Sequence, residues 1–317
     1  MKKSHSGANR LDIIIYYIIF HAFALLGRIP RKMAFRLAQW IGRLWFAVDM
    51  RHRKVAIENL SMVYGATMSP FEIRHLARRV FCNLSNIVFE IGWSLYLNDA
   101  RLRKYFRFQG MHHLNAAEKK RKGVLILTAH IGNWELLMRA AGMIGFSVSA
   151  VYRPFDFKPL DMFFAHLRSS SGTKLFPKTK AMRKIMRSLK NNELVGILLD
   201  QHAGRAAGIP VDFLGIEAGT SKGLALLAKS TGAPVIPAFL VREEGFYSIM
   251  FGQELTFIET GDNDFDLREN TRLYNQMIEA IILKYPEQWF WVHRRWKTRS
   301  HRRRSEKRVE PTNLTTS

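Results

Sequence analysis

A histidine and a glutamate, separated by four residues, are the side chains in this sequence best suited to acid–base chemistry. His130 follows the apolar run 124–129, and Glu135 follows Gly132 and Asn133. Within one helix, residues five apart lie on different faces, so the pair makes sense only across a turn from a strand into a helix. Asn133 can cap that helix. Glu135 then falls in its first turn, where the helix dipole keeps a carboxylate ionised.

An ionised carboxylate beside an imidazole fixes the tautomer of the ring and stabilises the imidazolium that forms when the ring accepts a proton. The spacing therefore predicts His130 as a general base and Glu135 as the group that orients it. Taken singly, a histidine at the end of a strand is more often a hydrogen-bonded structural residue. The prediction depends on what surrounds it.

Two further groups of residues are candidates for the site. Asp200 and Gln201 end an apolar strand, which is a common place for active-site residues in α/β proteins, although an aspartate there can also cap the next loop. The C-terminal segment interleaves tryptophans with basic residues; indoles settle at headgroup depth and arginine binds phosphate in a bidentate way. We predict lipid-headgroup or membrane contacts for Trp289, Trp291, Arg294, Arg295 and Lys297.

A rival motif suggests a serine esterase or lipase. Residues 219–223 satisfy the G-x-S-x-G pattern of the nucleophile elbow, with Ser221 as the nucleophile. The elbow needs an apolar strand directly before the serine, and the pattern of residues 215–219 predicts a loop instead. Dependence of activity on Ser221 or on His130 would separate the two enzyme classes.

Alternating apolar runs and helical stretches after residue 122 predict the elements that position these residues. The βαβα rhythm indicates an α/β fold with a mainly parallel or mixed central sheet flanked by helices. The expected strands are Val124–Ala129, Val148–Tyr152, Leu194–Leu199, Val235–Leu240 and Tyr247–Phe251, and the expected helices are Trp134–Met143, Pro159–Ser170, Thr179–Asn191, Ser221–Thr231 and Leu267–Lys284.

The N-terminal third is predicted to be helical and to carry a membrane anchor. Residues 13–27 are apolar but short for a spanning helix, so they span with help from their flanks, lie in the interface or re-enter the membrane from one side. A cleaved signal peptide is the alternative. Dense positive charge directly after the run favours retention on the cytoplasmic side, and the pattern of residues 30–48 predicts a basic amphipathic helix. Further helices are expected near 53–64 and 69–98, the latter capped by Ser69-Pro70.

The composition of the chain restricts the kinds of molecule that it is expected to bind. The formal charge of +23 and the pI of about 10.4 favour anionic partners, and 47% hydrophobic residues can fill a substantial core. Cys82 is the only cysteine, so no intramolecular disulfide forms, and burial explains it better than catalysis. His202 and the other histidines lack ligand spacing, which predicts no metal site. A basic, phosphate-binding, non-enzymatic protein is a third class, but no nucleic-acid signature supports it and we expect no nucleic acid partner.

The motif HIGNWE at residues 130–135 resembles the H-x4-D/E signature of glycerolipid and lipid A acyltransferases, in the form found in the lipid A secondary acyltransferase family. Four other parts of the sequence resemble blocks of that family, in the same order. Where the family commonly has an asparagine after Tyr-Arg-Pro, this chain has residues 155–158, and Leu214 replaces a phenylalanine; both departures concern the acceptor. The matching blocks are Arg51–Leu60, Tyr152–Pro154, Leu198–Gln201 with Phe213–Thr220, and Gln288–Lys297.

The resemblance implies an acyltransferase that moves a fatty acyl chain from acyl carrier protein, or from coenzyme A, to a hydroxyl of an anionic glycolipid such as a lipid A precursor. It implies a bacterial inner-membrane enzyme on the cytoplasmic face, without metal or cofactor. His130 and Glu135 are then catalytic, and Arg153, Asp200 and Asn133 hold the oxyanion or the substrate. The expected organisation is a leader and anchor over 1–29, one acyltransferase domain over 30–297 and a basic, disordered tail over 298–317.

Overall fold

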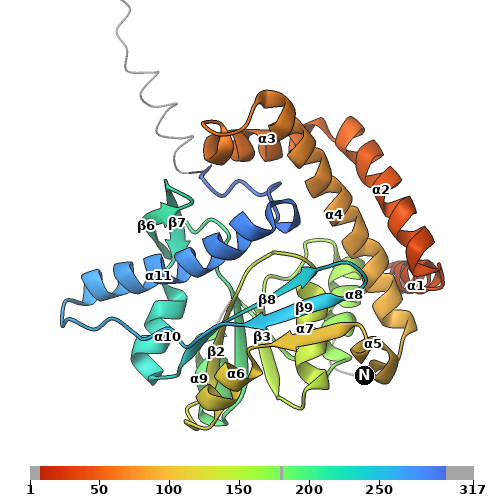
Figure 1. Cartoon of the computed structure of the whole chain (residues 1–317). Coiled ribbons are helices and arrows are strands. Elements are labelled where there is room, and N and C mark those ends of the chain that lie inside the picture. The colour runs from red at the N-terminus through yellow and green to blue at the C-terminus, as the bar shows by residue number, and fades with distance from the viewer. Residues whose placement is uncertain (1–7, 179–180, 298–317) are drawn as a thin grey trace, which may run out of the picture.

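In the computed structural model, which describes residues 8–178 and 181–297, a seven-stranded sheet forms the centre of the molecule (Figure 1). Its strand order is β1-β9-β8-β2-β5-β3-β4. Five neighbouring strands from β8 to β4 are parallel, β9 runs antiparallel to β8, and β1 is parallel to β9. The sheet is therefore mainly parallel, as predicted. Its strands are β1 Phe106–Gln109, β2 Val124–Thr128, β3 Val148–Tyr152, β4 Lys174–Pro177, β5 Leu194–Leu198, β8 Val235–Arg242 and β9 Tyr247–Phe251.

Both faces of the sheet are buried, as parallel sheets require. On β2, Leu125 and Leu127 belong to one core cluster, whereas Val124 and Ile126 belong to the other. The second cluster is covered by α6 (Met111–Glu118) and α7 (Trp134–Met143). The first cluster includes buried residues of five further helices around the sheet. They are α4 Pro70–Tyr96, α8 Lys158–Ser169, α9 Ala181–Lys190, α10 Gly223–Thr231 and α11 Asn263–Lys284.

The N-terminal part is helical, as predicted, and α1 Arg10–Leu26, α2 Arg31–Val48 and α3 Met50–Tyr64 precede the long helix α4. Ser69 caps α4 and forms a capping box with Glu72, with Pro70 as the first helical residue, so the expected cap is confirmed. Within the described ranges, no single helix has the length and apolar composition to cross a bilayer. Only α1 and α2 taken together, bent by 118°, meet that test.

The predicted strands and helices of the sheet region are present, with small shifts at their ends. Helix α11 begins at Asn263, four residues before the expected start, because the side chain of Asp262 accepts hydrogen bonds from the N–H groups of Asp264 and Phe265. The patterns did not predict β1, β4, α6 or the short helices α5 (Asp99–Arg103) and η1 (Pro286–Gln288). The expected tail over 298–317 lies outside the described residues.

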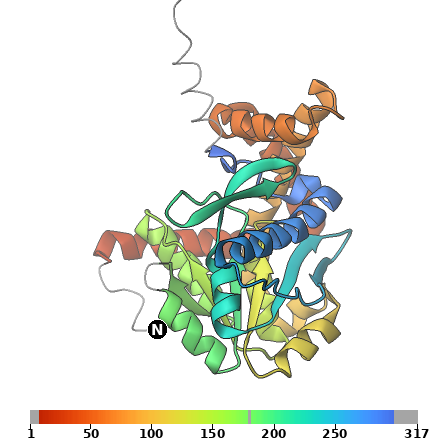
Figure 2. The ribbon, with the colours of Figure 1, turned by 90° about the vertical axis from the view of Figure 1, so that its left-hand side faces the viewer.

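The prediction of a loop over residues 215–219 is wrong. Residues Gly208–Phe213 and Ile216–Ser221 form β6 and β7, a separate antiparallel hairpin that lies beside α11 (Figure 2). Ile216, Ala218 and Thr220 are buried and alternate with less buried residues, which is the period of two of a half-buried strand. Glycines at 215 and 219 concealed that period in the sequence.

Candidate active site

The carboxyl ends of β2 and β5 bring His130 and Asp200 together. The two strands are parallel neighbours with Thr128 opposite Leu198, so the residues that follow each strand meet at one edge of the sheet. The Nδ1 of His130 lies 2.8 Å from Oδ1 of Asp200, and the backbone N–H of His130 donates to Oδ2 at 2.9 Å. The side chain of His130 is 19% exposed and that of Asp200 only 2%. A buried carboxylate thus holds a partly accessible imidazole.

The electrostatics of this pair favour a base. Burial by itself would raise the pKa of Asp200, but the nearby His130 ring, together with hydrogen bonds from His130 and from the indole of Trp289, lowers that pKa to about 2. The Trp289 Nε1 donates to Oδ2 at 2.7 Å. An ionised Asp200 accepts the Nδ1–H of His130, which leaves the lone pair on Nε2 for a proton. The amide Nε2 of Gln201 lies 3.3 Å from that Nε2.

Glu135 does not orient the imidazole, so that expected contact is wrong. Its buried carboxylate forms a bidentate pair with Arg168 of α8, at 2.7 Å and 2.8 Å. The first residue of α7, Trp134, packs its ring edge-on against His130 with the centroids 5.1 Å apart. Glu135 follows one position later, about 100° further around the helix, and therefore faces α8 instead. The pair ties α7 to α8.

The turn between His130 and α7 requires a glycine at position 132. Gly132 has φ +56°, and a Cβ there would lie 2.0 Å from the carbonyl oxygen of Leu240, so only glycine fits. Asn133 caps α7 as predicted, because its Oδ1 accepts from the N–H of Leu136 at 3.3 Å. Its Nδ2 also donates to Glu90 of α4 at 2.9 Å. No pattern in the sequence indicated this last contact.

The predicted membrane contacts of Trp289, Trp291 and Arg295 are wrong, because all three side chains are at most 1% exposed. Trp289 forms a β-bridge with Ile131, and the N–H of Phe290 donates to the carbonyl of His130 at 3.0 Å. The guanidinium of Arg295 donates to Gly219 O at 2.7 Å and to Thr220 Oγ1 at 2.6 Å. This segment therefore completes the site from inside. Arg294 and Lys297 are exposed.

Arg153 lies at the surface. Its side chain is 81% exposed, and the guanidinium lies 3.7 Å from the carboxylate of Asp156. Within residues 8–178 and 181–297, no hydrogen bond or ion pair links it to His130. The structure therefore does not bring Arg153 to the imidazole, in contrast to Asp200.

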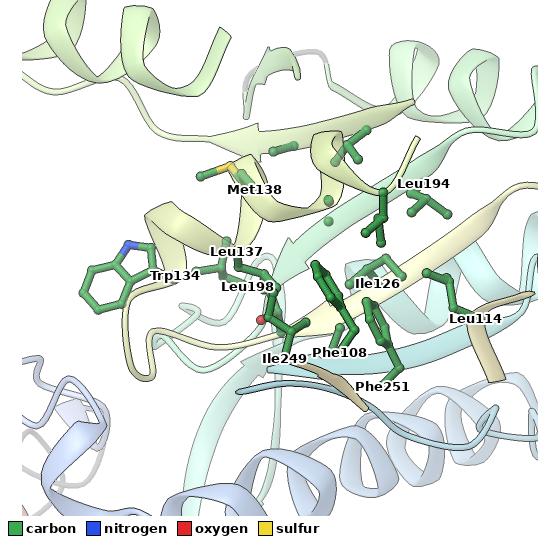
Figure 3. A pocket seen from close by; sticks show the side chains of 17 residues that line it. Phe108, Leu114, Ile126, Trp134, Leu137, Met138, Leu194, Leu198, Ile249 and Phe251 are labelled. Carbon is green, nitrogen blue, oxygen red and sulfur yellow. The ribbon is translucent and has the colours of Figure 1, made fainter. Parts of the chain in front are cut away.

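An apolar cavity lies between α7 and the sheet, beginning at Trp134. Figure 3 shows Met138 and Leu137 of α7 above Phe108, Ile249 and Phe251 of the strands, with Trp134 at the left, at the start of the helix. Gly196 of β5 also lines it, so no side chain from that position fills the space. Trp134 contacts both this cavity and the His130 ring, which places the cavity next to the base.

Ser221 lacks the partners of a hydrolytic serine. It ends β7, outside the main sheet, and its Oγ accepts a hydrogen bond from the N–H of Gly223 at 3.3 Å. No histidine or carboxylate hydrogen bonds to Ser221 in the part of the chain that the structure describes. The geometry required of a Ser-His-Asp triad is therefore not formed here.

The chain is similar to proteins of known activity. Residues 2–298 match the family described as bacterial lipid A biosynthesis acyltransferase. The lipid A biosynthesis lauroyltransferase of Escherichia coli K12 is 27% identical over 281 residues, covering 87% of this chain and 89% of the relative. The palmitoleoyltransferase of the same strain is 27% identical over 275 residues, covering 86% and 87%. A phosphatidylinositol mannoside acyltransferase of Mycolicibacterium smegmatis is 25% identical over 211 residues, covering 63% and 65%. The chain therefore belongs to the bacterial lipid A biosynthesis acyltransferase family and is an acyltransferase.

Proposed function

We propose that the protein transfers a fatty acyl chain from a thioester of acyl carrier protein, or of coenzyme A, to a hydroxyl of a lipid A precursor, with His130 as general base. The reaction class follows from the family; the donor, the acceptor hydroxyl and the residue roles are proposals. One observation supports the role of His130: an ionised, buried Asp200 lies 2.8 Å from Nδ1 of His130, so the lone pair of Nε2, which among the described residues faces only the amide of Gln201 at 3.3 Å, can accept a proton.

The geometry supports a direct transfer. His130 Nε2 removes the proton of the acceptor hydroxyl as its oxygen attacks the thioester carbonyl carbon. When the tetrahedral intermediate collapses, the C–S bond breaks and the thiolate takes the proton from the imidazolium. Asp200 stays ionised throughout and stabilises the charged ring, so its role is orientation and electrostatics.

The developing oxyanion needs donors close to His130. The N–H of Gly132 already donates to the carbonyl of Gln288 at 3.0 Å, so it is not available. The N–H groups of Asn133 and Trp134 at the start of α7, and the amide of Gln201, are the candidates that remain near the ring. Arg153, exposed as it is, suits binding of an anionic substrate group better than the oxyanion.

The apolar cavity of Figure 3 is the proposed site of the acyl chain. Its free space is about 50 Å³, so a long chain enters only when side chains move. Met138 is unbranched and flexible, which suits such a movement. The length of the transferred chain then depends on how far the cavity opens between α7 and β9.

The N-terminal helices are the proposed membrane contact, at the cytoplasmic face of the bacterial inner membrane. One side of α1 packs on the protein, with Phe23 and Phe163 4.6 Å apart between ring centroids. The other side exposes a stripe of large apolar residues, and α2 does the same. An interfacial position along the surface suits this arrangement better than a spanning one. The exposed residues include Leu11, Ile14, Tyr17, Ile18, Leu25, Met33, Leu37, Trp40, Leu44 and Val48.

The experiment uses the purified full-length protein in detergent with acyl-carrier-protein and coenzyme A thioesters, a lipid A precursor, and mass spectrometry of the product. We expect His130→Ala to reduce turnover by about 10²–10⁴-fold, and Asp200→Asn by a comparable factor. His112→Ala, at an exposed position, serves as the control. If a folded His130→Ala variant kept turnover within about twofold of wild type, His130 would not be the general base.

The Glu135→Gln variant tests whether Glu135 ties α7 to α8 through Arg168 and does not orient His130. Because this change leaves the buried Arg168 without its charged partner, we expect it to destabilise the fold by about 3–5 kcal/mol. The pH at which turnover falls to half should then stay that of wild type. A shifted pH profile of turnover without loss of stability would instead indicate that Glu135 orients the imidazole of His130.

A further inference from the structure

A second, larger cavity lies on the other side of the catalytic turn, between α2, α4 and the β8–β9 turn. We propose that it binds the headgroup of a phospholipid, with the phosphate near the basic residues of α2 and hydrogen-bond donors of the headgroup near the glutamates. Its free volume is about 890 Å³. The proposal rests on the proposed membrane placement of α2, but it concerns a site separate from His130.

The wall formed by α2 is basic. Lys32 and Arg36, one helical turn apart, both line the cavity, and neither has an acidic partner among the described residues. The guanidinium of Arg31 lies over the rings of Trp93 and Tyr105, at 4.6 Å and 4.4 Å, which fixes its position. Pro30 gives the start of α2 no side-chain cap, so the positive end of the helix dipole adds to these charges. The wall suits a phosphate.

Acidic residues also line the cavity, together with Arg79 and Arg242. Glu243, Glu244 and Glu287 line it from the β8–β9 turn and η1. Glu287 pairs with Arg79 at 3.3 Å and Glu243 accepts from the hydroxyl of Tyr285 at 3.1 Å, whereas Glu244 has no basic partner in the described ranges. Carboxylates of this kind can accept hydrogen bonds from the ammonium or hydroxyl of a bound headgroup. A headgroup that joins a phosphate to such donors therefore complements both the basic residues of α2 and these glutamates.

Helix α2 also gives the tails of such a lipid a path to the bilayer. Ala38, Gly42 and Phe46 of α2 are buried in the protein. The basic residues Lys32 and Arg36 occupy the next sector of the helix surface. Beyond them lies the exposed apolar stripe that includes Trp40 and Leu44. The cavity mouth thus lies between the protein and the lipid-facing stripe, at the depth where headgroups are found.

The floor of this cavity supports the catalytic turn from behind. Glu90 lines the cavity and accepts a hydrogen bond from Asn133 at 2.9 Å, and the carbonyl of Gln288 accepts from Gly132. Arg242 also lines the cavity; it pairs with Glu90, and its Nη1 donates to Asn83 at 2.6 Å. The headgroup and the acyl chain therefore occupy opposite sides of the Gly132–Asn133 turn.

Binding of water-soluble dihexanoyl lipids, below their micelle-forming concentrations, tests the proposal by equilibrium dialysis with the full-length protein. Phosphatidylethanolamine and phosphatidylglycerol offer an ammonium and hydroxyls; phosphatidylcholine offers no such donor, and inorganic phosphate lacks the tails. We expect the first two to bind at least about tenfold more tightly than phosphatidylcholine or phosphate, the effect of about one charge-assisted hydrogen bond.

Three variants locate the binding. Ala34→Trp fills the cavity and should reduce affinity at least about tenfold, whereas Ala47→Trp, exposed on the same helix, should not. The double variant Lys32→Ala with Arg36→Ala should also weaken binding, because it removes the positive charges proposed to bind the phosphate. Both side chains are exposed, so the change does not disturb the core. Equal affinity of all four ligands, or unchanged affinity in both Ala34→Trp and the double variant, would overturn the proposal.

His130→Ala separates this site from the proposed function. It should reduce transfer by about 10²–10⁴-fold and leave the affinity for phosphatidylethanolamine unchanged. Binding lost in His130→Ala would place the lipid at the catalytic cavity and overturn the second site. Transfer retained in that variant, with headgroup binding intact, would count against the catalytic base alone.

Discussion

Helix α2 and the C-terminal segment 288–297 use the same residue types in opposite ways. Both combine tryptophan with arginine, yet Trp40 of α2 is 70% exposed while Trp291 is fully buried. Arg43 lies on the surface of α2, whereas Arg295 is fully buried and donates to backbone and hydroxyl oxygens. The difference shows that an abundance of indole and guanidinium groups does not by itself indicate a membrane surface.

The physical reason lies in the backbone. Helix α2 satisfies its own hydrogen bonds and can leave one face in another solvent. After η1, the segment has no regular structure of its own, so its polar groups need partners elsewhere. Asn59 of α3 donates to the carbonyls of Trp291 and His293, both at 2.7 Å, and the carbonyl of His130 accepts from Phe290. Those bonds draw the segment into the interior.

Truncation of a buried tryptophan should give the largest effect. Trp291 is fully buried and packs edge-on against Trp289 with the ring centroids 4.7 Å apart. We expect Trp291→Ala to lower the free energy of unfolding by about 3–5 kcal/mol, measured by urea denaturation in detergent. A loss below about 1 kcal/mol would mean that the segment does not belong to the core.

A smaller effect is expected at His293, which should make the stability of the fold depend on pH. Burial lowers the pKa of His293 from 6.5 to about 4, so in this range the unfolded chain binds more protons than the folded protein. Stability should therefore fall as the pH drops from about 6.5 to about 4. In His293→Gln, the free energy of unfolding should depend less on pH between about 6.5 and about 4. An equally steep pH dependence in the variant would assign it to other groups.

The smallest effect on folding is expected at the exposed tryptophan. We expect Trp40→Ser to change the free energy of unfolding by less than about 0.5 kcal/mol, because the ring contacts little of the core. Partitioning into vesicles in a flotation assay should nevertheless decrease, with Ala66→Ser, at another exposed position, as a control that changes neither quantity. Unchanged partitioning of Trp40→Ser would argue against α2 as the lipid-facing surface.

Local pattern was enough to predict much of this protein. Apolar runs predicted β2, β3, β5, β8 and β9 and the apolar segment of α1, and helical spacing predicted α2 to α4, because period and capping are properties of neighbouring residues. His130 at the end of β2 and Asn133 as the cap of α7 follow from the same local information. The alternation of β7 was hidden by Gly215, just before the strand, and by Gly219 within it.

The partners of the site residues were decided by the tertiary structure. Asp200 lies 70 residues after His130 and Trp289 a further 89 residues on, and they meet only because β2 and β5 are neighbours and the C-terminal segment returns to Ile131. Glu135, close to the histidine in sequence, instead faces Arg168 because one step along a helix turns a side chain about 100°. Sequence spacing specifies the residues that surround a turn, whereas the packing of strands and helices specifies which of them touch.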